Sequence, residues 1–167
     1  MTMSDLPPAS FQANGYTVSE QQNMDLIVRF LAEPKPIVGD RRAALFHPGY
    51  AIHRWGMANL QGMRQEAMES GVEVSGYDAG SMVDRTDTLV YMLAKSDMVW
   101  AVFRLEGTHT GTLWGVEASG RQMDLLELGV FRIVDGLIAD AWFMNDELAI
   151  CRQLGLVDAN VLWGKAK

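Results

Sequence analysis

The sequence lacks clustered positive charge. Its 14 lysines and arginines are outnumbered by 21 aspartates and glutamates, which gives a net charge of −7, and no run of basic residues occurs. Binding to a phosphate backbone requires a basic surface. We therefore expect no nucleic-acid partner.

Cysteine and long apolar runs are also scarce. The single cysteine, Cys151, cannot form an internal disulfide, which is typical of a reducing compartment. No apolar run approaches the ~20 residues that a membrane span requires. The first ten residues, MTMSDLPPAS, lack the basic and apolar parts of a secretory signal. These absences predict a cytoplasmic protein with no membrane partner.

Motifs for cofactors and metals are absent as well. The GTHTG segment at 107–111 has neither the spacing nor the following helix of a dinucleotide or phosphate-binding loop. The three histidines, His47, His53 and His109, are scattered and form no HxH or HExxH motif. We expect no cofactor and no metal, and His109 between glycines is more typical of a structural residue.

The remaining pattern predicts one α+β domain. A chain of 167 residues is most often a single domain, here 19–167, preceded by a flexible arm over 1–18 that contains Pro7-Pro8 and Asn14-Gly15. Helical spacing and a capping-box pattern (Ser19 with Gln22) come first, and alternating strands follow. The helices are expected at 19–33, at 40–46 (ended by His47-Pro48), at 57–70 and, capped by Asp146, at 147–154. A short extended segment is expected at 50–55, and strands are expected at 86–94, 98–110, 121–134 and 137–145. This order predicts helices packed on one side of a curved antiparallel sheet.

The strand at 121–134 is apolar on both faces. Successive side chains alternate between faces, so Glu127 shares one face with Leu125 and Gly129, whereas Leu126 and Leu128 lie on the other. An apolar face must be covered. The helices cover one face, and a twofold partner is the simplest cover for the other, which predicts a homodimer.

Glu127 is the main candidate for chemistry. Burying an ionised carboxylate costs several kcal/mol unless it is paired, hydrogen-bonded or protonated. One hypothesis is a carboxyl group with a raised pKa that acts as general acid or base in a pocket. The alternative is a structural ion pair with Arg104 or another cation. Gly129 beside it either makes room for a ligand or marks a β-bulge.

Several segments then resemble a known family. GTHTGTLWG (107–115), FRIVDGLIADAW (131–142) and CRQLGL (151–156) are similar to the SnoaL-like polyketide cyclase family of the nuclear-transport-factor-2-like (NTF2-like) superfamily, and the similarity extends over about 19–156. The resemblance implies a cone: a strongly curved antiparallel sheet wrapped around N-terminal helices, with a deep apolar pocket. It also implies dimerisation through the outer face of the sheet.

The resemblance implies a chemistry that this sequence alters. The characterised cyclases close a polyketide ring by a cofactor-free aldol condensation, using an Asp on the last strand and a His on the neighbouring strand. Those positions fall on Phe143 and Gly129 here. Neither residue can transfer a proton, so the usual pair is missing. Glu127, one inward step from Gly129, is the candidate for a relocated acid/base.

Other residues are expected around this carboxylate. His53, which the resemblance places near the pocket mouth, is either a second acid/base or a histidine satisfied by the backbone. By strand parity Phe143 points inward and Trp142 outward. The residues expected to line the pocket are Tyr50, Trp55, Leu125, Gly129, Phe131, Phe143 and Asn145.

Two functions remain open from the sequence. The first is cofactor-free acid/base catalysis (aldol-type cyclisation, isomerisation, or a lyase or hydrolase reaction) on a small apolar carbonyl compound. The second is a non-catalytic ligand-binding or dimerisation module on the same fold. An enzyme predicts Glu127 in a cavity without a cation partner. A scaffold predicts a collapsed pocket or a carboxylate held in an ion pair.

Overall fold

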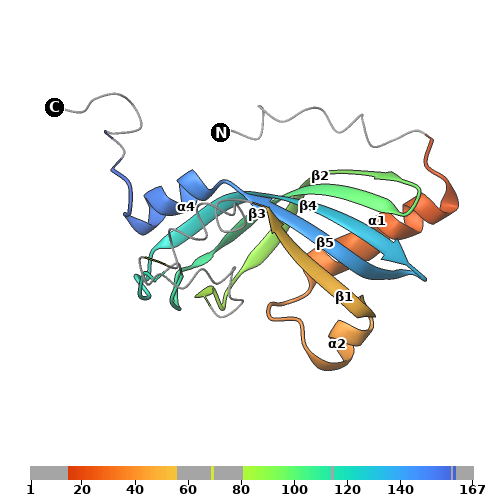
Figure 1. Cartoon of the computed structure of the whole chain (residues 1–167), viewed down its shortest axis with the longest axis horizontal. Coiled ribbons are helices and arrows are strands. Elements are labelled where there is room, and N and C mark those ends of the chain that lie inside the picture. Colours follow the sequence, from red (N-terminus) through yellow and green to blue (C-terminus); the bar gives the residue numbers. More distant parts are fainter. Residues whose placement is uncertain (1–14, 56–68, 70–80, 114, 159, 161–167) are drawn as a thin grey trace.

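The computed structural model describes residues 15–55, 69, 81–113, 115–158 and 160 (Figure 1). The helices are α1 (Val18–Ala32), α2 (Gly39–Ala43) and α4 (Glu147–Leu154). The strands are β1 (Phe46–Trp55), β2 (Thr86–Lys95), β3 (Met98–Thr108), β4 (Gln122–Val134) and β5 (Leu137–Asn145). Residues 1–14 of the predicted arm over 1–18 lie outside the described residues, and so does the predicted helix over 57–70 except for Glu69.

The five strands form one curved sheet in the order β1-β5-β4-β3-β2. Strands β2 to β5 are the predicted antiparallel meander, and α1 lies along one face of the sheet (Figure 1). The mixed α+β class and the curved sheet are therefore confirmed. Strand β1, however, pairs in parallel with β5, so the sheet is mixed rather than purely antiparallel.

Strand β1 begins earlier than the sequence predicts. The His47-Pro48 pair was expected to end a short helix, but β1 starts at Phe46 and runs through Pro48. Proline is tolerated because β1 is the edge strand and its register with β5 shifts between Phe46 and Ala51. The parallel pairing with β5 places Arg54 opposite Phe143.

Two local predictions at the C-terminal half are confirmed. Asp135 and Gly136 form the β4–β5 turn with positive φ angles of 51° and 74°, as a type I′ hairpin requires. Asp146 caps α4, because its carboxylate accepts a hydrogen bond from the backbone N–H of Ala149 at 3.0 Å.

The start of α1 uses a different capping box from the predicted one. Thr17 is the N-cap and Glu20 its partner, instead of Ser19 and Gln22. The buried Glu20 carboxylate accepts hydrogen bonds from the backbone N–H of Thr17 (2.8 Å) and from that of Ser96 (2.9 Å) in the β2–β3 turn. The pKa of Glu20 is lowered from 4.5 to about 2, mainly by the hydrogen bonds from the backbone N–H groups of Thr17 and Ser96. Glu20 thus fastens α1 to the sheet.

Glu20→Gln should therefore weaken the fold at neutral pH. A carboxyl group with a lowered pKa stabilises the folded state above its ordinary value of 4.5, and this contribution disappears as the pH falls towards about 2. Urea unfolding at pH 7 should show a less stable variant, with the difference shrinking at pH 2.5. The exposed Glu117 gives a matched control, Glu117→Gln, whose effect should be small. A pH-independent loss in Glu20→Gln would contradict the capping role.

The core lies between α1 and the face of the sheet that meets it, called the inner face below. Met24, Ile27, Phe30 and Leu31 of α1 pack there against a cluster that includes Phe103, Phe131 and Phe143. A second cluster joins α4 to the other end of the sheet through Leu105, Met123, Leu125, Ile150 and Leu154. The inner face is thus apolar at both ends, and its charged residues lie between.

Candidate functional site

Glu127 is buried on the inner face of β4, with 1% of its surface exposed. Its carboxylate accepts a hydrogen bond from Arg54 Nη1 at 2.8 Å on Oε1 and a longer one from Arg85 Nη2 at 3.4 Å on Oε2. Burial raises the pKa of Glu127, while Arg85 and then Arg54 act in the opposite direction. The carboxylate is therefore both desolvated and paired.

The partners of Glu127 differ from the one considered in the sequence. Arg104 lies on the other face, where it forms a two-pronged pair with Asp124 at 2.7 and 2.6 Å. Arg54 reaches Glu127 because β1 runs alongside β5. No local sequence pattern predicts the parallel pairing of β1 with β5.

A second buried carboxylate, Asp87, continues the network. Arg85 donates to both of its oxygens, from Nε at 2.7 Å and from Nη2 at 3.1 Å, and so bridges Asp87 and Glu127. Lys35 Nζ lies 3.3 Å from Asp87 Oδ2 and donates to the backbone carbonyls of Phe30 and Glu33 at the end of α1. The side chain of Asp87 is fully buried. We call Lys35, Asp87, Arg85, Glu127 and Arg54 the inner charge network.

Sequence reasoning missed four members of this network: Arg54, Arg85, Asp87 and Lys35. Arg85 and Asp87 are two residues apart at the start of β2, and such spacing places both side chains on one face. That alternation was a usable signal. Lys35, between two prolines, carried none. Burial lowers the pKa of Lys35, and the neighbouring Asp87 acts against that shift.

Aromatic rings enclose the Arg54 end of the network. The Arg54 guanidinium lies 4.9 Å from the centre of the Phe143 ring, a cation–π distance. Phe143 in turn meets Phe131 edge-on at 5.6 Å. Asn145 is the cross-strand partner of Glu127, and its buried Oδ1 has no hydrogen-bond partner within the part of the chain that the structure describes. A buried acceptor without a donor is uncommon in folded proteins.

Gly129 is explained by packing between rings. Its register is regular, opposite Ala101 and Phe143, so it does not mark a bulge. A Cβ atom there would come within 2.7 Å of the Phe131 ring and 3.3 Å of Phe103. The space beside Gly129 is therefore filled by aromatic side chains of the protein itself.

Gly129→Ala should destabilise the protein by about 1–3 kcal/mol, the usual cost of overpacking a core. The rings of Phe131 and Phe103 are both fully buried and have little freedom to move. Chemical denaturation should show the loss. Gly49→Ala is the matched control, because the added methyl group lies at an ordinary contact distance. Gly115→Ala is not suitable, because the positive φ of Gly115 would strain an alanine there. An unchanged midpoint for Gly129→Ala would contradict this packing.

The remaining predicted site residues divide between the two faces. Tyr50 packs on Phe46 at 4.5 Å, and Leu125 and Phe131 are core residues of the inner face. His53 and Trp55 alternate with Arg54 and lie on the outer face, away from Glu127. His53 stacks on Trp142 at 4.9 Å, with Nε2 3.1 Å from Asp140 Oδ1, and Trp55 lies 6.5 Å from Trp142. The structure therefore does not bring His53 and Trp55 to the carboxylate.

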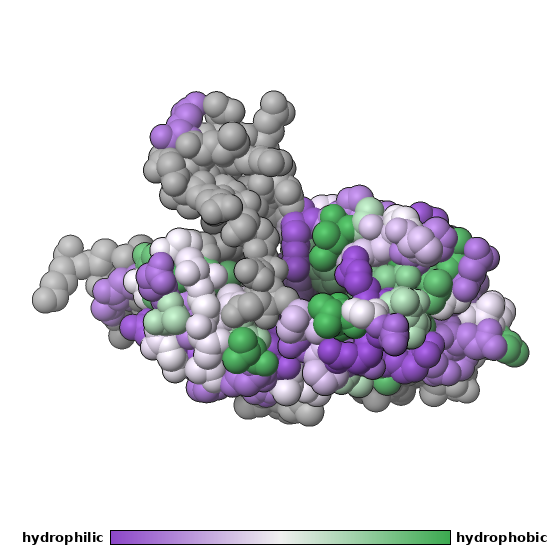
Figure 2. Space-filling view, turned by 90° about the horizontal axis from the view of Figure 1, so that it is seen from below, coloured by the Kyte–Doolittle hydropathy of each residue, from purple (hydrophilic) through white to green (hydrophobic). Residues whose placement is uncertain are grey.

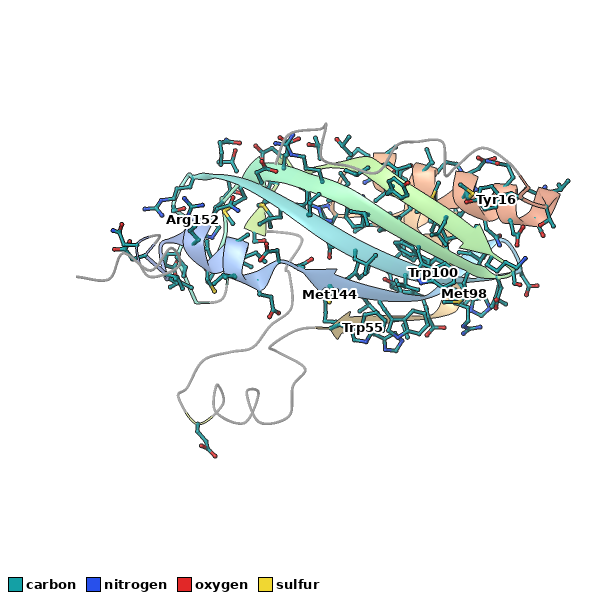
Figure 3. All side chains as sticks on the ribbon, turned by 90° about the horizontal axis from the view of Figure 1, so that it is seen from above. Tyr16, Trp55, Met98, Trp100, Met144 and Arg152 are labelled. Carbon is teal, nitrogen blue, oxygen red and sulfur yellow. The ribbon has the colours of Figure 1, made fainter. Side chains whose placement is uncertain are left out.

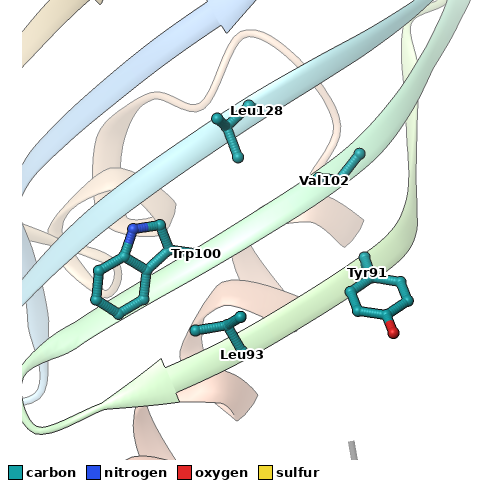
Figure 4. Close-up of a pocket in the computed structure, with 5 residues that line it drawn as sticks. All are labelled: Tyr91, Leu93, Trp100, Val102 and Leu128. Carbon is teal, nitrogen blue, oxygen red and sulfur yellow. The ribbon is translucent and has the colours of Figure 1, made fainter. Parts of the chain in front are cut away.

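The outer face of the sheet carries an apolar depression. Side chains of three strands surround a volume of about 340 Å³, namely Tyr91, Leu93, Trp100, Val102 and Leu128 (Figure 4). Figure 3 shows Trp100, Met98, Met144 and Trp55 at the same end of the sheet. Around this depression the outer face is apolar, as the sequence of β4 predicts, and the Arg104–Asp124 pair lies farther along it.

Within the described ranges, no group of three or more His, Cys, Asp or Glu side chains is placed to hold a metal ion. Nor does any helix in those ranges have the length and apolarity needed to cross a membrane.

Comparison with known proteins identifies related sequences and folds. Residues 84–154 match the family model described as SnoaL-like polyketide cyclase. A protein from Jannaschia sp. CCS1 described as SnoaL-like polyketide cyclase is 19% identical, with a TM-score of 0.66 over 87% of this chain and 100% of that one. TsrD from Streptomyces laurentii is 24% identical, with a TM-score of 0.62 over 86% and 100%.

A phenazine biosynthesis-related protein from Pseudomonas aeruginosa is 12% identical, with a TM-score of 0.63 over 90% of this chain and 93% of that one. At these identities the structures establish the fold alone. No curated protein matches the chain. The family model confirms the predicted resemblance over residues 84–154, and the solved structures confirm the predicted α+β fold with its curved sheet.

Proposed function

We propose that this chain, which resembles the SnoaL-like polyketide cyclases in sequence over 84–154 and in fold, catalyses cofactor-free acid/base chemistry on a small apolar carbonyl compound. The observation that carries the proposal is the inward Glu127 carboxylate, buried to 1% exposure beside two guanidinium groups. A base of this kind suits removal of a proton from the carbon next to a carbonyl group. Aldol closure and isomerisation both begin with that step.

From the sequence, a carboxylate held in an ion pair was the expectation for a non-catalytic scaffold, and Glu127 is paired with both Arg54 and Arg85. These ion pairs are nevertheless compatible with catalysis, because charge is conserved when the proton is transferred. When the carboxylate takes the proton, the electrons of the C–H bond form the enolate, and the negative charge moves from Glu127 to the substrate oxygen. Arg54 and Arg85 then stabilise that oxygen as they stabilised the carboxylate. Return of the proton from Glu127 to a different carbon gives an isomer, and attack of the enolate on a second carbonyl gives an aldol product.

Burial keeps the Glu127 carboxylate basic, because it raises the pKa of that group more than the two arginines lower it. Two nearby cations lower the pKa of a carboxyl group, but desolvation is the larger effect here and the pKa is raised. A base is most effective when its pKa approaches the working pH. Asn145 lies across from Glu127, and its Oδ1 accepts no hydrogen bond from the described residues, so it can accept one from a substrate hydroxyl or enol.

Proton exchange tests the proposal without knowledge of the natural substrate. Acetophenone in D2O with the full-length protein should lose its methyl protons faster than in buffer alone, as followed by proton NMR. Exchange no faster than in buffer, across acetophenone, cyclohexenone and indanone, would leave the non-catalytic binding module as the better account.

We also propose a homodimer through the outer face. The depression formed by Tyr91, Leu93, Trp100, Val102 and Leu128 supports it, because exposed apolar patches on a sheet are typical of interfaces. Trp100→Glu should convert a dimer to a monomer, and light scattering after gel filtration measures the mass. Leu148→Glu, at an exposed leucine of α4, is the matched control and should stay dimeric. A monomeric wild-type protein would contradict the proposal.

A further inference from the structure

Asn145 is the last residue of β5 and lies directly across the sheet from Glu127. Side chains of directly paired residues in an antiparallel sheet point to the same face, with Cβ atoms about 4.5–5.5 Å apart. The next residue, Asp146, caps α4, so the end of the strand and the start of the helix together fix the backbone at Asn145. The amide group of Asn145 is therefore a close neighbour of the carboxylate proposed as the base.

The amide oxygen of Asn145 is buried, yet no described residue donates a hydrogen bond to it. The nearest side chain on the same face of β5 is that of Phe143, which has no donor. Burying an acceptor without a donor destabilises a folded protein. Packing alone would therefore favour an apolar side chain of the same shape, such as leucine, at this position.

The β1 side of this site is in contact with solvent. Ile52 and Arg54 alternate with His53 and lie on the inner face, where they pair with Ala141 and Phe143. Ile52 is 52% exposed, and the side chain of Arg54 is 24% exposed. Figure 2, seen from the side of α2 and β1, shows apolar side chains at the surface among hydrophilic ones. This edge offers an apolar molecule contact with the face that carries Glu127 and Asn145.

We propose that Asn145 determines specificity in this site by accepting a hydrogen bond from a hydroxyl group of the substrate, while Glu127 removes a proton from the carbon next to the one that bears the hydroxyl. The substrate class is then a β-hydroxy carbonyl compound. Because the two side chains form one cross-strand pair, the hydroxyl group and the acidic C–H bond must also be close together in the substrate. This inference rests on the proposed function, because it places the hydroxyl group relative to the base.

The proton transfer leaves the hydroxyl group unchanged. The proton passes from carbon to the Glu127 carboxylate, the electrons of the C–H bond form the enolate, and the hydroxyl group keeps its own proton in the hydrogen bond to Asn145 Oδ1. A compound without the hydroxyl group leaves that buried oxygen unpaired, and a site of this kind discriminates against such a compound.

Two aromatic ketones test the inference. β-Hydroxypropiophenone and butyrophenone have the same acidic methylene group beside the carbonyl and nearly the same shape, but the first has a hydroxyl group where the second has a methyl group. The full-length protein is titrated with each by NMR, and deuterium exchange of the methylene group in D2O is followed in the same samples. We expect the hydroxy compound to bind about threefold or more tightly, within the range of one neutral hydrogen bond.

Asn145→Leu makes the test specific. Leucine has nearly the shape of asparagine but no acceptor, so the ratio of hydroxy to methyl affinity should fall about tenfold and the preference should reverse. The unfolding midpoint of the variant should equal or exceed that of the wild type, because an unpaired buried acceptor is removed. A clearly lower midpoint would show that Asn145 has a partner within the protein, and would overturn the inference.

Asn23→Leu is the matched control. The side chain of Asn23, on α1, donates to the carbonyl oxygen of Ser96 at 3.1 Å. Its replacement should lower the unfolding midpoint slightly and leave the affinity ratio unchanged, which is the opposite pattern to that of Asn145→Leu.

Equal affinities for the two ketones, or a preference that survives Asn145→Leu, would contradict the role of Asn145. If both ketones exchange faster than in buffer but bind equally well, the proposed function stands and the hydroxyl preference falls. If the hydroxy compound is preferred through Asn145 and neither compound exchanges, the acceptor site stands and the catalytic role falls. If neither compound binds or exchanges, both are contradicted.

Discussion

Asp87→Ala should destabilise the protein by about 3–5 kcal/mol, the cost of leaving buried cations without their counter-charge. The substitution removes the partner of Lys35, at 3.3 Å, and the two-pronged partner of Arg85, at 2.7 and 3.1 Å. Lys35 is already costly to ionise, because burial lowers its pKa. Denaturant unfolding at pH 7 is the measurement.

A second aspartate provides an unusually close control. Asp124 forms the same two-pronged pair with Arg104, at 2.7 and 2.6 Å, but on the exposed outer face. Asp124→Ala should therefore cost far less, since water solvates the arginine that remains. Asp87→Asn keeps the shape and distinguishes loss of charge from loss of volume. Equal effects of Asp87→Ala and Asp124→Ala would show that burial of the network does not matter.

Glu127→Gln should reduce carbonyl proton exchange by about 10²–10⁴-fold, the usual contribution of a general base. Glutamine has the same shape as glutamate but cannot take a proton, and it leaves Arg54 and Arg85 in place. Exchange of acetophenone methyl protons in D2O gives the rate. Binding of 4-acetylbenzamide to Glu127→Gln, measured in parallel, shows whether the variant is still correctly folded.

Glu127→Asp separates chemistry from folding in case Glu127→Gln is unstable. Aspartate retains a carboxylate for the two arginines, and the shorter side chain displaces the base from the substrate. We expect a folded protein with exchange between that of the wild type and that of Glu127→Gln. Wild-type exchange in Glu127→Gln would exclude Glu127 as the base.

The sequence predicted the meander of β2 to β5 because each strand alternates clearly and the turns have strong signals, such as Asp135-Gly136. It did not predict β1 in full. Parallel pairing of β1 with β5 joins residues far apart in the chain, so no local pattern reveals it. For the same reason, the sequence did not identify Arg54 as the partner of Glu127.

The burial of Glu127 followed from alternation along β4, whereas its environment depended on tertiary contacts. Arg85 directly precedes β2, Asp87 lies in β2 and Lys35 follows the end of α1, and only the folded sheet brings them together. His53 was expected near the carboxylate, yet the parity of β1 turns it to the outer face beside Trp142. Gly129 was expected to mark space for a ligand or a bulge, and the Phe131 ring occupies that space.

Carbon-detected NMR titration of the full-length protein measures the pKa of the Glu127 carboxyl group, on which the acid/base role depends. We expect a midpoint above the ordinary value of 4.5, because burial outweighs Arg85 and Arg54, and a further change when acetophenone is added. A midpoint at or below 4.5 that no carbonyl compound moves would contradict the acid/base role and leave Glu127 as a structural ion pair.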